Sequence, residues 1–248
     1  MTAVQGLVAA VVGAMVGSFA NVVIYRVPRR ESVVAPRSRC PACGHPIAAR
    51  DNVPLLSFLL LRGRCRHCGT AISWRYPLVE ALTALLFVAV WRAFGPTWEG
   101  LRAALFVLIL VVVVFVDLDH RLIPNAVTYP GMAAGLLLAL PDGPAALAER
   151  VLAGVGAGAF FLAVAVVSRG GMGGGDVKLA AVMGLFLGWP TIAAALFLSF
   201  LAGGLVGIAL ILLGLRRRKD AIPFGPFLAL GSLAGLFWGA SLVRWYFG

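Results

Sequence analysis

Long apolar runs alternate with short polar segments along almost the whole chain. Because a helix needs about 17–25 apolar residues to cross a bilayer, runs at or near that length can be marked directly on the sequence. They lie at 4–25, 76–94, 100–118, 125–140, 147–167, 177–189, 191–213 and 224–247, and the fourth and sixth are the shortest. The pattern predicts an all-α polytopic membrane protein with about eight transmembrane helices.

Composition supports a membrane protein and gives its orientation. Of the 248 residues, 61% are hydrophobic and only 12% are charged, which excludes an ordinary soluble domain. The first run has no basic residue before it and a basic segment after it, so it is predicted to be a retained anchor with its N-terminus outside. Alternate loops then face the cytoplasm and hold 17 of the 21 Lys and Arg residues, as the positive-inside rule requires. The net charge of +11 is explained by this topology and by contact with anionic membrane lipids, so no nucleic-acid partner is expected.

The one long polar segment, residues 26–75, follows the first apolar run and contains all four cysteines. They form two Cys-x-x-Cys pairs: Cys40 with Cys43, and Cys65 with Cys68. Paired knuckles of this kind are typical of a four-thiolate zinc site, whose role is structural because no coordination position is left open. Two disulfides are the alternative, and the predicted cytoplasmic location disfavours them. His45 and His67 flank the knuckles and are expected to be bystanders.

Three carboxylates lie next to apolar runs, where an ionisable group suggests a function. Asp117 and Asp119 occur in "FVDLDHRLIPN", and Asp176 occurs in "GGGDVK". The topology brings both segments to the cytoplasmic face, which is the arrangement that an aspartyl dyad requires. Asp117 and Asp119 are two positions apart on a helix, so only one of them should meet Asp176. An ion pair of Asp117 with Arg121 and a capping role for Asp176 stay open as alternatives.

Several motifs together resemble those of the bacterial type IV prepilin peptidases, in the same order and over nearly the whole chain. They are "GSFANVVIYRVP", the two cysteine knuckles, "DNVPLLSFLLLRGRC", "ISWRYPLVE", "DLDHRLIPN", "GMGGGDVKLAAVMG" and "IPFGPFLALG". The resemblance implies an aspartic endopeptidase of the bacterial inner membrane, which removes the leader of prepilins or pseudopilins of pilus or type II secretion machinery at the cytoplasmic face. It implies Asp117 and Asp176 as the catalytic pair. Many relatives have aspartate where this chain has Asn125, a position outside that pair.

The resemblance also implies a second activity, methylation of the new N-terminus with S-adenosylmethionine, and a zinc-binding loop of four cysteines. On this basis residues 1–98 would form a methyltransferase-like region containing the loop 26–75, and residues 99–248 the peptidase bundle. No G-x-G-x-x-G motif exists, so the methyl donor cannot bind in a Rossmann crevice. Polar residues near the first run and the loop are the candidates for its site: Ser18, Asn21, Arg26, Asp51, Asn52 and Glu80. For Asn21, a hydrogen bond between helices is the alternative.

Three other functions are considered. The chain could be a peptidase whose methylase is inactive. It could be a proton-coupled transporter that uses Asp117 and Asp176 as a relay, although such carboxylates are expected near the bilayer midplane rather than near one surface. A membrane scaffold with a zinc loop and no catalysis would tolerate the loss of either aspartate.

Overall fold

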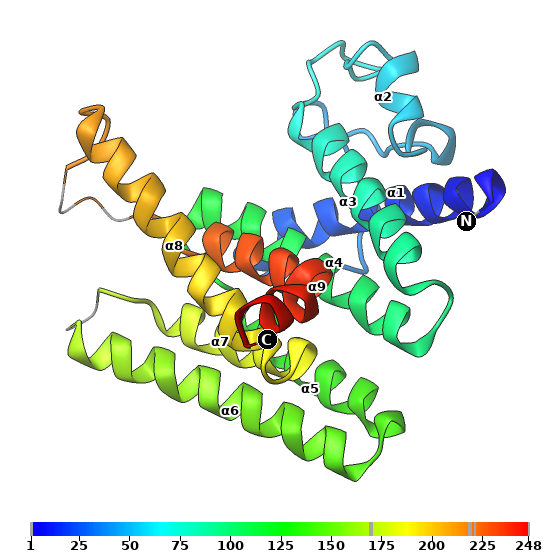
Figure 1. The fold of residues 1–248 in the computed structure, drawn as a ribbon. Helices are drawn as coiled ribbons and strands as arrows, with labels where there is room; N and C mark the ends of the chain where they lie inside the picture. Colours follow the sequence, from blue (N-terminus) through cyan, green and yellow to red (C-terminus); the bar gives the residue numbers. More distant parts are fainter. Residues whose placement is uncertain (1, 169–170, 218–219, 221, 248) are drawn as a thin grey trace. The chain divides into compact units, whose positions relative to one another are not determined.

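The chain folds into helices joined by mostly short loops, as seen in a computed structural model (Figure 1). The structure describes residues 2–168, 171–217, 220 and 222–247. Arg169, Arg218 and Lys219, which the sequence places in cytoplasmic loops, lie outside the described residues. Within the described ranges no strand forms, and the only β-type pairings are two isolated bridges in the cysteine loop. The predicted all-α membrane fold is confirmed.

Nine α-helices and three short 3₁₀ helices make up the described part of the chain. The α-helices are α1 (Ala3–Arg26), α2 (Leu56–Leu60), α3 (Arg75–Phe94), α4 (Trp98–His120), α5 (Asn125–Ala139), α6 (Pro144–Val167), α7 (Gly174–Leu187), α8 (Thr191–Leu212) and α9 (Gly225–Phe247). The 3₁₀ helices are η1 (Val27–Arg29), η2 (Ala49–Asp51) and η3 (Leu140–Asp142).

Six of these helices are long and apolar enough to cross a membrane: α1, α3, α4, α6, α8 and α9. The other two predicted spans coincide with α5 and α7, which have 15 and 14 residues. The α5 helix gives way to η3, which has Pro141 in its first turn, and α7 stops at Gly188, whose φ of +69° cannot continue a helix. The prediction of eight spans is therefore not confirmed, although all eight predicted segments are helical.

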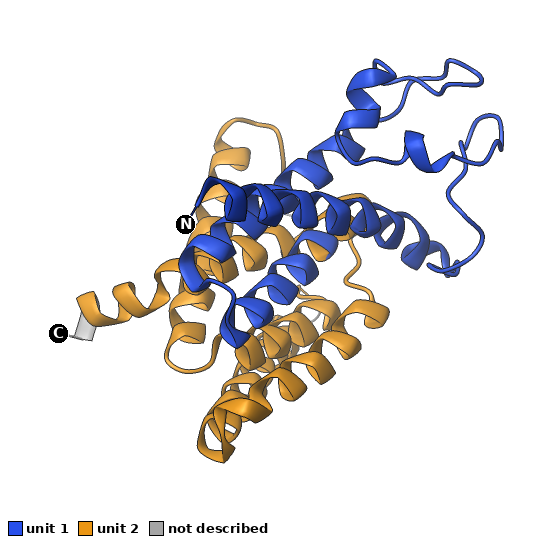
Figure 2. Ribbon diagram, turned by 90° about the vertical axis from the view of Figure 1, so that its right-hand side faces the viewer, with its two compact units in different colours: residues 1–112 blue, residues 113–248 orange. Residues whose placement is uncertain are grey.

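The chain divides into two compact units, residues 1–112 and 113–248, shown in blue and orange in Figure 2. The division falls within α4, so one continuous helix contributes to both units.

In the first unit, α1 and α3 pack as an antiparallel pair. A Cβ atom at Gly13 would lie 2.8 Å from the Cα of Ala84, and one at Gly17 would lie 2.9 Å from the Cα of Glu80. Glycine is required at both points because the two backbones approach too closely for any side chain. This contact holds the C-terminal end of α1 beside the N-terminal end of α3. The cysteine loop, which includes α2, connects these two ends.

In the second unit, α7 packs against α5 and α6, and α8 packs against α9. Here two glycines meet, since a Cβ atom at Gly184 would lie 2.5 Å from the Cα of Gly154. The C-terminal end of α7 is held by α6: Arg150 donates a 2.8 Å hydrogen bond to the carbonyl of Phe186, and Glu149 accepts one from the N–H of Trp189. These contacts satisfy groups that a helix end leaves unpaired, and they fix α7, which carries Asp176.

Candidate functional site

Asp117 lies near the C-terminal end of α4 and points into the second unit. Its side chain is buried, with 5% of the residue exposed. Its Oδ2 accepts a 2.8 Å hydrogen bond from the backbone N–H of Gly225, the first residue of α9. Asp119, two positions further along, is exposed. Burial therefore distinguishes Asp117 from Asp119, which the sequence left as alternatives.

Asp176 lies in the first turn of α7. Its Oδ2 accepts a 3.1 Å hydrogen bond from the N–H of Gly173, the N-cap residue. Asp176 is thus not the N-cap itself, but from the third helical position its side chain accepts the hydrogen bond of the N-cap N–H. Burial, with a smaller contribution from the negative charge of Asp117, raises the pKa of Asp176 to about 6, against the lowering effect of the Gly173 hydrogen bond. Asp176 can therefore cap α7 and at the same time interact electrostatically with Asp117.

A glycine of the "GGGD" motif explains how the two segments meet. A Cβ atom at Gly175 would lie only 2.8 Å from the Cβ of Ile123, a buried residue of the loop between α4 and α5. Because Gly175 has no side chain, that loop lies directly against the first turn of α7. Asn125, at the start of α5, adds a polar link, since its Oδ1 accepts a 2.6 Å hydrogen bond from Lys178. The ends of α4 and α7 that carry the aspartates are thereby tied together.

Gly225 is a residue of this site that sequence reasoning missed. One signal was usable, the "PFGP" turn at the start of the last apolar run. Gly225 contacts Asp117 so closely that a Cβ atom there would lie 2.7 Å from Oδ2. The first N–H groups of a helix have no partner within the helix, so the start of α9 offers a donor that a carboxylate can use.

The four cysteines form a cluster in the first unit. Their sulfur atoms all lie within 4.8 Å of one another, and the sulfurs of Cys40 and Cys68 are 3.8 Å apart. Four thiolates bound to one zinc ion at about 2.3 Å would lie about 3.8 Å apart, so the donor set fits a tetrahedral metal. All four thiols are free in this structure.

The two knuckles have the same backbone geometry. The N–H of Cys40 donates to the carbonyl of His45, and the N–H of Cys65 donates to the carbonyl of Thr70. Gly44 and Gly69 both have a φ of +70°, a conformation that favours glycine, and this turn returns the chain beside each pair of sulfurs. The rings of His45 and His67 stack with centroids 3.5 Å apart. Neither histidine belongs to the sulfur cluster.

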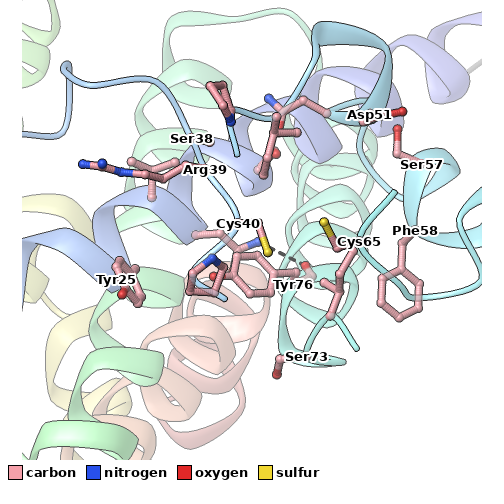
Figure 3. Close-up of a pocket in the computed structure, with 18 of the residues that line it drawn as sticks. Tyr25, Ser38, Arg39, Cys40, Asp51, Ser57, Phe58, Cys65, Ser73 and Tyr76 are labelled. Atoms are coloured by element: carbon pink, nitrogen blue, oxygen red, sulfur yellow. Dashed lines mark hydrogen bonds between the residues drawn. The ribbon is translucent and has the colours of Figure 1, made fainter. Parts of the chain in front are cut away.

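A cavity of about 970 Å³ lies beside this cluster, between the end of α1, the loop and the start of α3. Figure 3 shows Tyr25, Tyr76 and Phe58 among its aromatic residues, with Asp51 and Ser57 at its polar parts. All six polar residues that the sequence nominated line this one cavity: Ser18, Asn21, Arg26, Asp51, Asn52 and Glu80.

Asn21 and Arg26 form hydrogen bonds within the first unit. The Nδ2 of Asn21 donates a 3.1 Å hydrogen bond to the carbonyl of Tyr76, which links α1 to α3 as the alternative interpretation proposed. Arg26 donates to the carbonyls of Ser32 and Pro36, at 2.8 and 2.7 Å. These two residues hold the cavity wall in place.

Asp51 forms a two-pronged ion pair with Arg66, whose Nη2 lies 2.6 Å from Oδ1. The Arg66 guanidinium lowers the pKa of Asp51, so this carboxylate is satisfied within the loop.

Glu80 is the buried carboxylate of the cavity. Only 8% of the residue is exposed, and its Oε2 accepts a 2.8 Å hydrogen bond from the N–H of Leu55. Leu55 has a φ of +62°, which is rare for a residue with a side chain, so this hydrogen bond helps to hold a strained turn just before α2. Asn52 lies on the same stretch of loop. Glu80 thus connects α3 to the loop that lines the same cavity.

Both halves of the chain match known protein families. Residues 11–94 match the model of the bacterial peptidase A24 N-terminal domain, and residues 104–208 match that of the type IV leader peptidase family. A prepilin leader peptidase/N-methyltransferase of Aeromonas hydrophila is 43% identical to this chain. The alignment covers 94% of this chain and 90% of that protein. The chain belongs to the type IV leader peptidase family. The resemblance inferred from the motifs is confirmed, and the chain is an enzyme of this family.

Two further relatives in the family carry the same name. The one from Bacillus subtilis (strain 168) is 40% identical, with 94% of each chain covered, and the one from Legionella pneumophila is 37% identical, with 94% and 91% covered. No solved structure matches the chain. Asp117 and Asp176 lie in the part that matches the leader peptidase model, while the cysteines and the cavity lie in the part that matches the N-terminal model.

Proposed function

We propose that this enzyme removes the leader peptide of prepilins or pseudopilins with Asp117 and Asp176 as a catalytic dyad. One observation carries the proposal: Gly175 lets the loop after α4, which follows the buried Asp117, lie directly against the first turn of α7, which holds Asp176. In the predicted eight-span topology, the excess of basic residues in alternate loops supports a site at the cytoplasmic face of the bacterial inner membrane.

The surroundings of the two aspartates suggest a division of roles. Asp176, whose pKa is raised, is the member that keeps a proton and donates a hydrogen bond to the scissile carbonyl. Asp117, oriented by the N–H of Gly225, is the carboxylate that accepts a proton from the attacking water. Two carboxyl groups that share one proton are the working state of an aspartic protease.

The decisive experiment is a cleavage assay in membranes with a prepilin substrate. Asp117→Asn and Asp176→Asn should each lower the cleavage rate by about 10²–10⁴-fold, since each removes one partner of acid–base catalysis. Asp119→Asn is the matched control, because that aspartate is on the same helix end but exposed, and it should cleave at the normal rate. Full cleavage by the Asp117 or the Asp176 variant would overturn the dyad and would favour a scaffold. Loss of proton flux in proteoliposomes with cleavage unchanged would instead support the transporter hypothesis.

We also propose that residues 1–98 form the methyltransferase region and residues 99–248 the peptidase bundle. The methyl donor, S-adenosylmethionine, would bind in the cavity beside the cysteine cluster. Cavities that hold ligands of this kind are typically about 300–1,000 Å³ and combine apolar walls with a few polar groups, and this cavity meets both conditions. The donor supplies an electrophilic methyl group when bound. Asn52 and Glu80 are the polar side chains best placed to contact the reactants.

Glu80 has the further role of proton acceptor in this proposal. The substrate amine must lose a proton before its nitrogen can attack a methyl group. A buried carboxylate in the cavity can bind the ammonium group and take that proton. The test is mass spectrometry of the mature pilin, in which a methylated N-terminus gains one CH₂ unit. A product that is cleaved but never methylated would indicate a peptidase whose methylase is inactive.

Zinc bound by Cys40, Cys43, Cys65 and Cys68 completes the proposal. Four protein thiolates leave no position for a substrate, so the metal would stabilise the loop rather than take part in chemistry. Cys40 and Cys65 also line the cavity (Figure 3). Metal binding would therefore fix the walls of the methyl-donor site.

A further inference from the structure

The short helix α2 exposes an apolar face. Leu59 and Leu60 are 67% and 80% exposed, and Val53 and Leu56 nearby are also exposed. The opposite face is packed: Ser57 is buried and donates a 3.0 Å hydrogen bond to the carbonyl of Arg50. A loop helix that faced water would carry polar residues on its outer face. Leucine at these positions indicates that the outer face meets something apolar.

The position of α2 in the first unit places this face close to the membrane surface. The ring of Phe58, in α2, contacts the ring of Trp74 at a centroid distance of 4.9 Å. Trp74 directly precedes α3, one of the helices long and apolar enough to span the bilayer, and it is 76% exposed. Tryptophan at the end of a spanning helix is typical of the membrane–water interface. Because α2 touches that residue, it lies at the same level.

The charges beside α2 favour a lipid surface over a second copy of the chain. Arg62 and Arg64 follow the helix directly and are exposed. Residues 26–75 contain ten arginines and only two acidic residues, Glu31 and Asp51. Two such loops would repel each other, whereas anionic headgroups would attract both arginines.

We propose that Leu56, Leu59 and Leu60 insert into the interface of the membrane that α3 crosses, with Arg62 and Arg64 at the anionic headgroups. The ligand is the phospholipid surface itself. The other side of the same segment, at Leu55, Ser57 and Phe58, lines the cavity of the first unit. Lipid contact would therefore hold one wall of the cavity in position. This docking surface is defined by exposure, charge and contact with Trp74, and it stands whether or not the cavity binds a methyl donor.

The test measures the depth of one residue in the full-length protein in phospholipid nanodiscs. An environment-sensitive fluorescent amino acid is introduced at Leu60, which is exposed enough to accept it, and in a second variant at Ala48, an exposed residue of the same loop outside α2. Quenching by phospholipids brominated on their acyl chains is compared with quenching by aqueous iodide. The probe at Leu60 should be quenched by the lipid at least about threefold more than the probe at Ala48, and iodide should reach it less.

Charge is tested by a second pair of samples. In nanodiscs that contain anionic lipid, Arg62→Gln combined with Arg64→Gln should reduce the lipid quenching at Leu60, and in purely zwitterionic nanodiscs it should change little. Iodide quenching of Leu60 equal to that of Ala48 would overturn the proposal, because the face would then meet water. Shielding of Leu60 from both quenchers would also overturn it, since a protein surface would then cover the helix.

Discussion

The backbone N–H of Gly225 donates a 2.8 Å hydrogen bond to the carboxylate of Asp117, 108 residues earlier in the chain. The bond joins the N-terminus of α9 to the C-terminal end of α4 and sets the orientation of one proposed catalytic group. Any side chain at position 225 would displace that carboxylate, because its Cβ atom would lie 2.7 Å from Oδ2.

Gly225→Ala should therefore impair cleavage without removing either aspartate. The added Cβ would lie 2.7 Å from Oδ2 of Asp117, so the carboxylate must move, and displacement of a catalytic group by about 1 Å can cost on the order of 10²-fold in rate. Gly204→Ala is the matched control, because nothing lies within 4 Å of a Cβ atom at that position on α8. Initial rates of prepilin cleavage would be compared at equal amounts of folded protein, and equal rates for the two variants would contradict the positioning role.

The titration of Asp176 should follow its raised pKa. A carbodiimide modifies protonated carboxyl groups, so labelling of Asp176, read by mass spectrometry, should decline as the pH rises through about 6. Asp117→Asn removes a negative charge that raises this pKa, so the midpoint should move to lower pH. Because folding favours the protonated form of Asp176, the contribution of its carboxyl group to the free energy of unfolding is lost as the pH rises from about 4 through about 6. An unchanged midpoint in the variant would show that the two carboxyl groups do not interact.

Replacement of one cysteine should release the metal and affect methylation more than cleavage. Cys68→Ser leaves three thiolates, so zinc measured by atomic emission should fall from about one ion per chain to near none. The loop should then be cut more rapidly by an added protease, and methylation should be lost, because the loop lines the cavity. His67→Ala is the control: that ring stacks on His45 rather than joining the sulfurs, so zinc should be retained. Equal loss of zinc in both variants would mean that the histidine is a ligand.

Glu80→Gln should reduce methylation by about 10²-fold and leave cleavage intact. Glutamine can still accept the hydrogen bond from Leu55, so the turn should be preserved, but it cannot take a proton. The deficit should shrink above about pH 8, where an α-amino group loses its proton to water. Glu31→Gln changes an exposed residue that also lines the cavity and should methylate normally. If the Glu80 variant fails to bind S-adenosylhomocysteine in calorimetry, the residue binds the donor and the proton-acceptor role is wrong.

Much of this fold is readable from the sequence because a bilayer imposes simple rules. The apolar runs predict all eight long helices to within a few residues, since every spanning segment must satisfy its own backbone hydrogen bonds. Hydropathy does not predict where α5 and α7 end, and both are shorter than the six candidate spans. Their ends are set by Pro141 and by Gly188, and local backbone conformation at such residues does not appear in an average of hydropathy.

The candidate sites were predictable where a side chain carries the chemistry. Cysteine spacing pointed to the sulfur cluster, and rare acids near apolar runs pointed to Asp117 and Asp176. The contribution of Gly225 could not be predicted, because it acts through a backbone N–H whose partner is set only by how α9 packs against α4. The same holds for Gly175, whose role depends on the position of Ile123.

The boundary within α4 limits how this protein can be divided. A cut between residues 112 and 113, where the two compact units separate, would break a spanning helix in its apolar stretch and leave two fragments too short to insert. A working pair of split genes would have to keep α4 whole, with the break in the loop at 95–97 or at 121–124. Whichever fragment carried α4 would also carry residues that belong to the other compact unit.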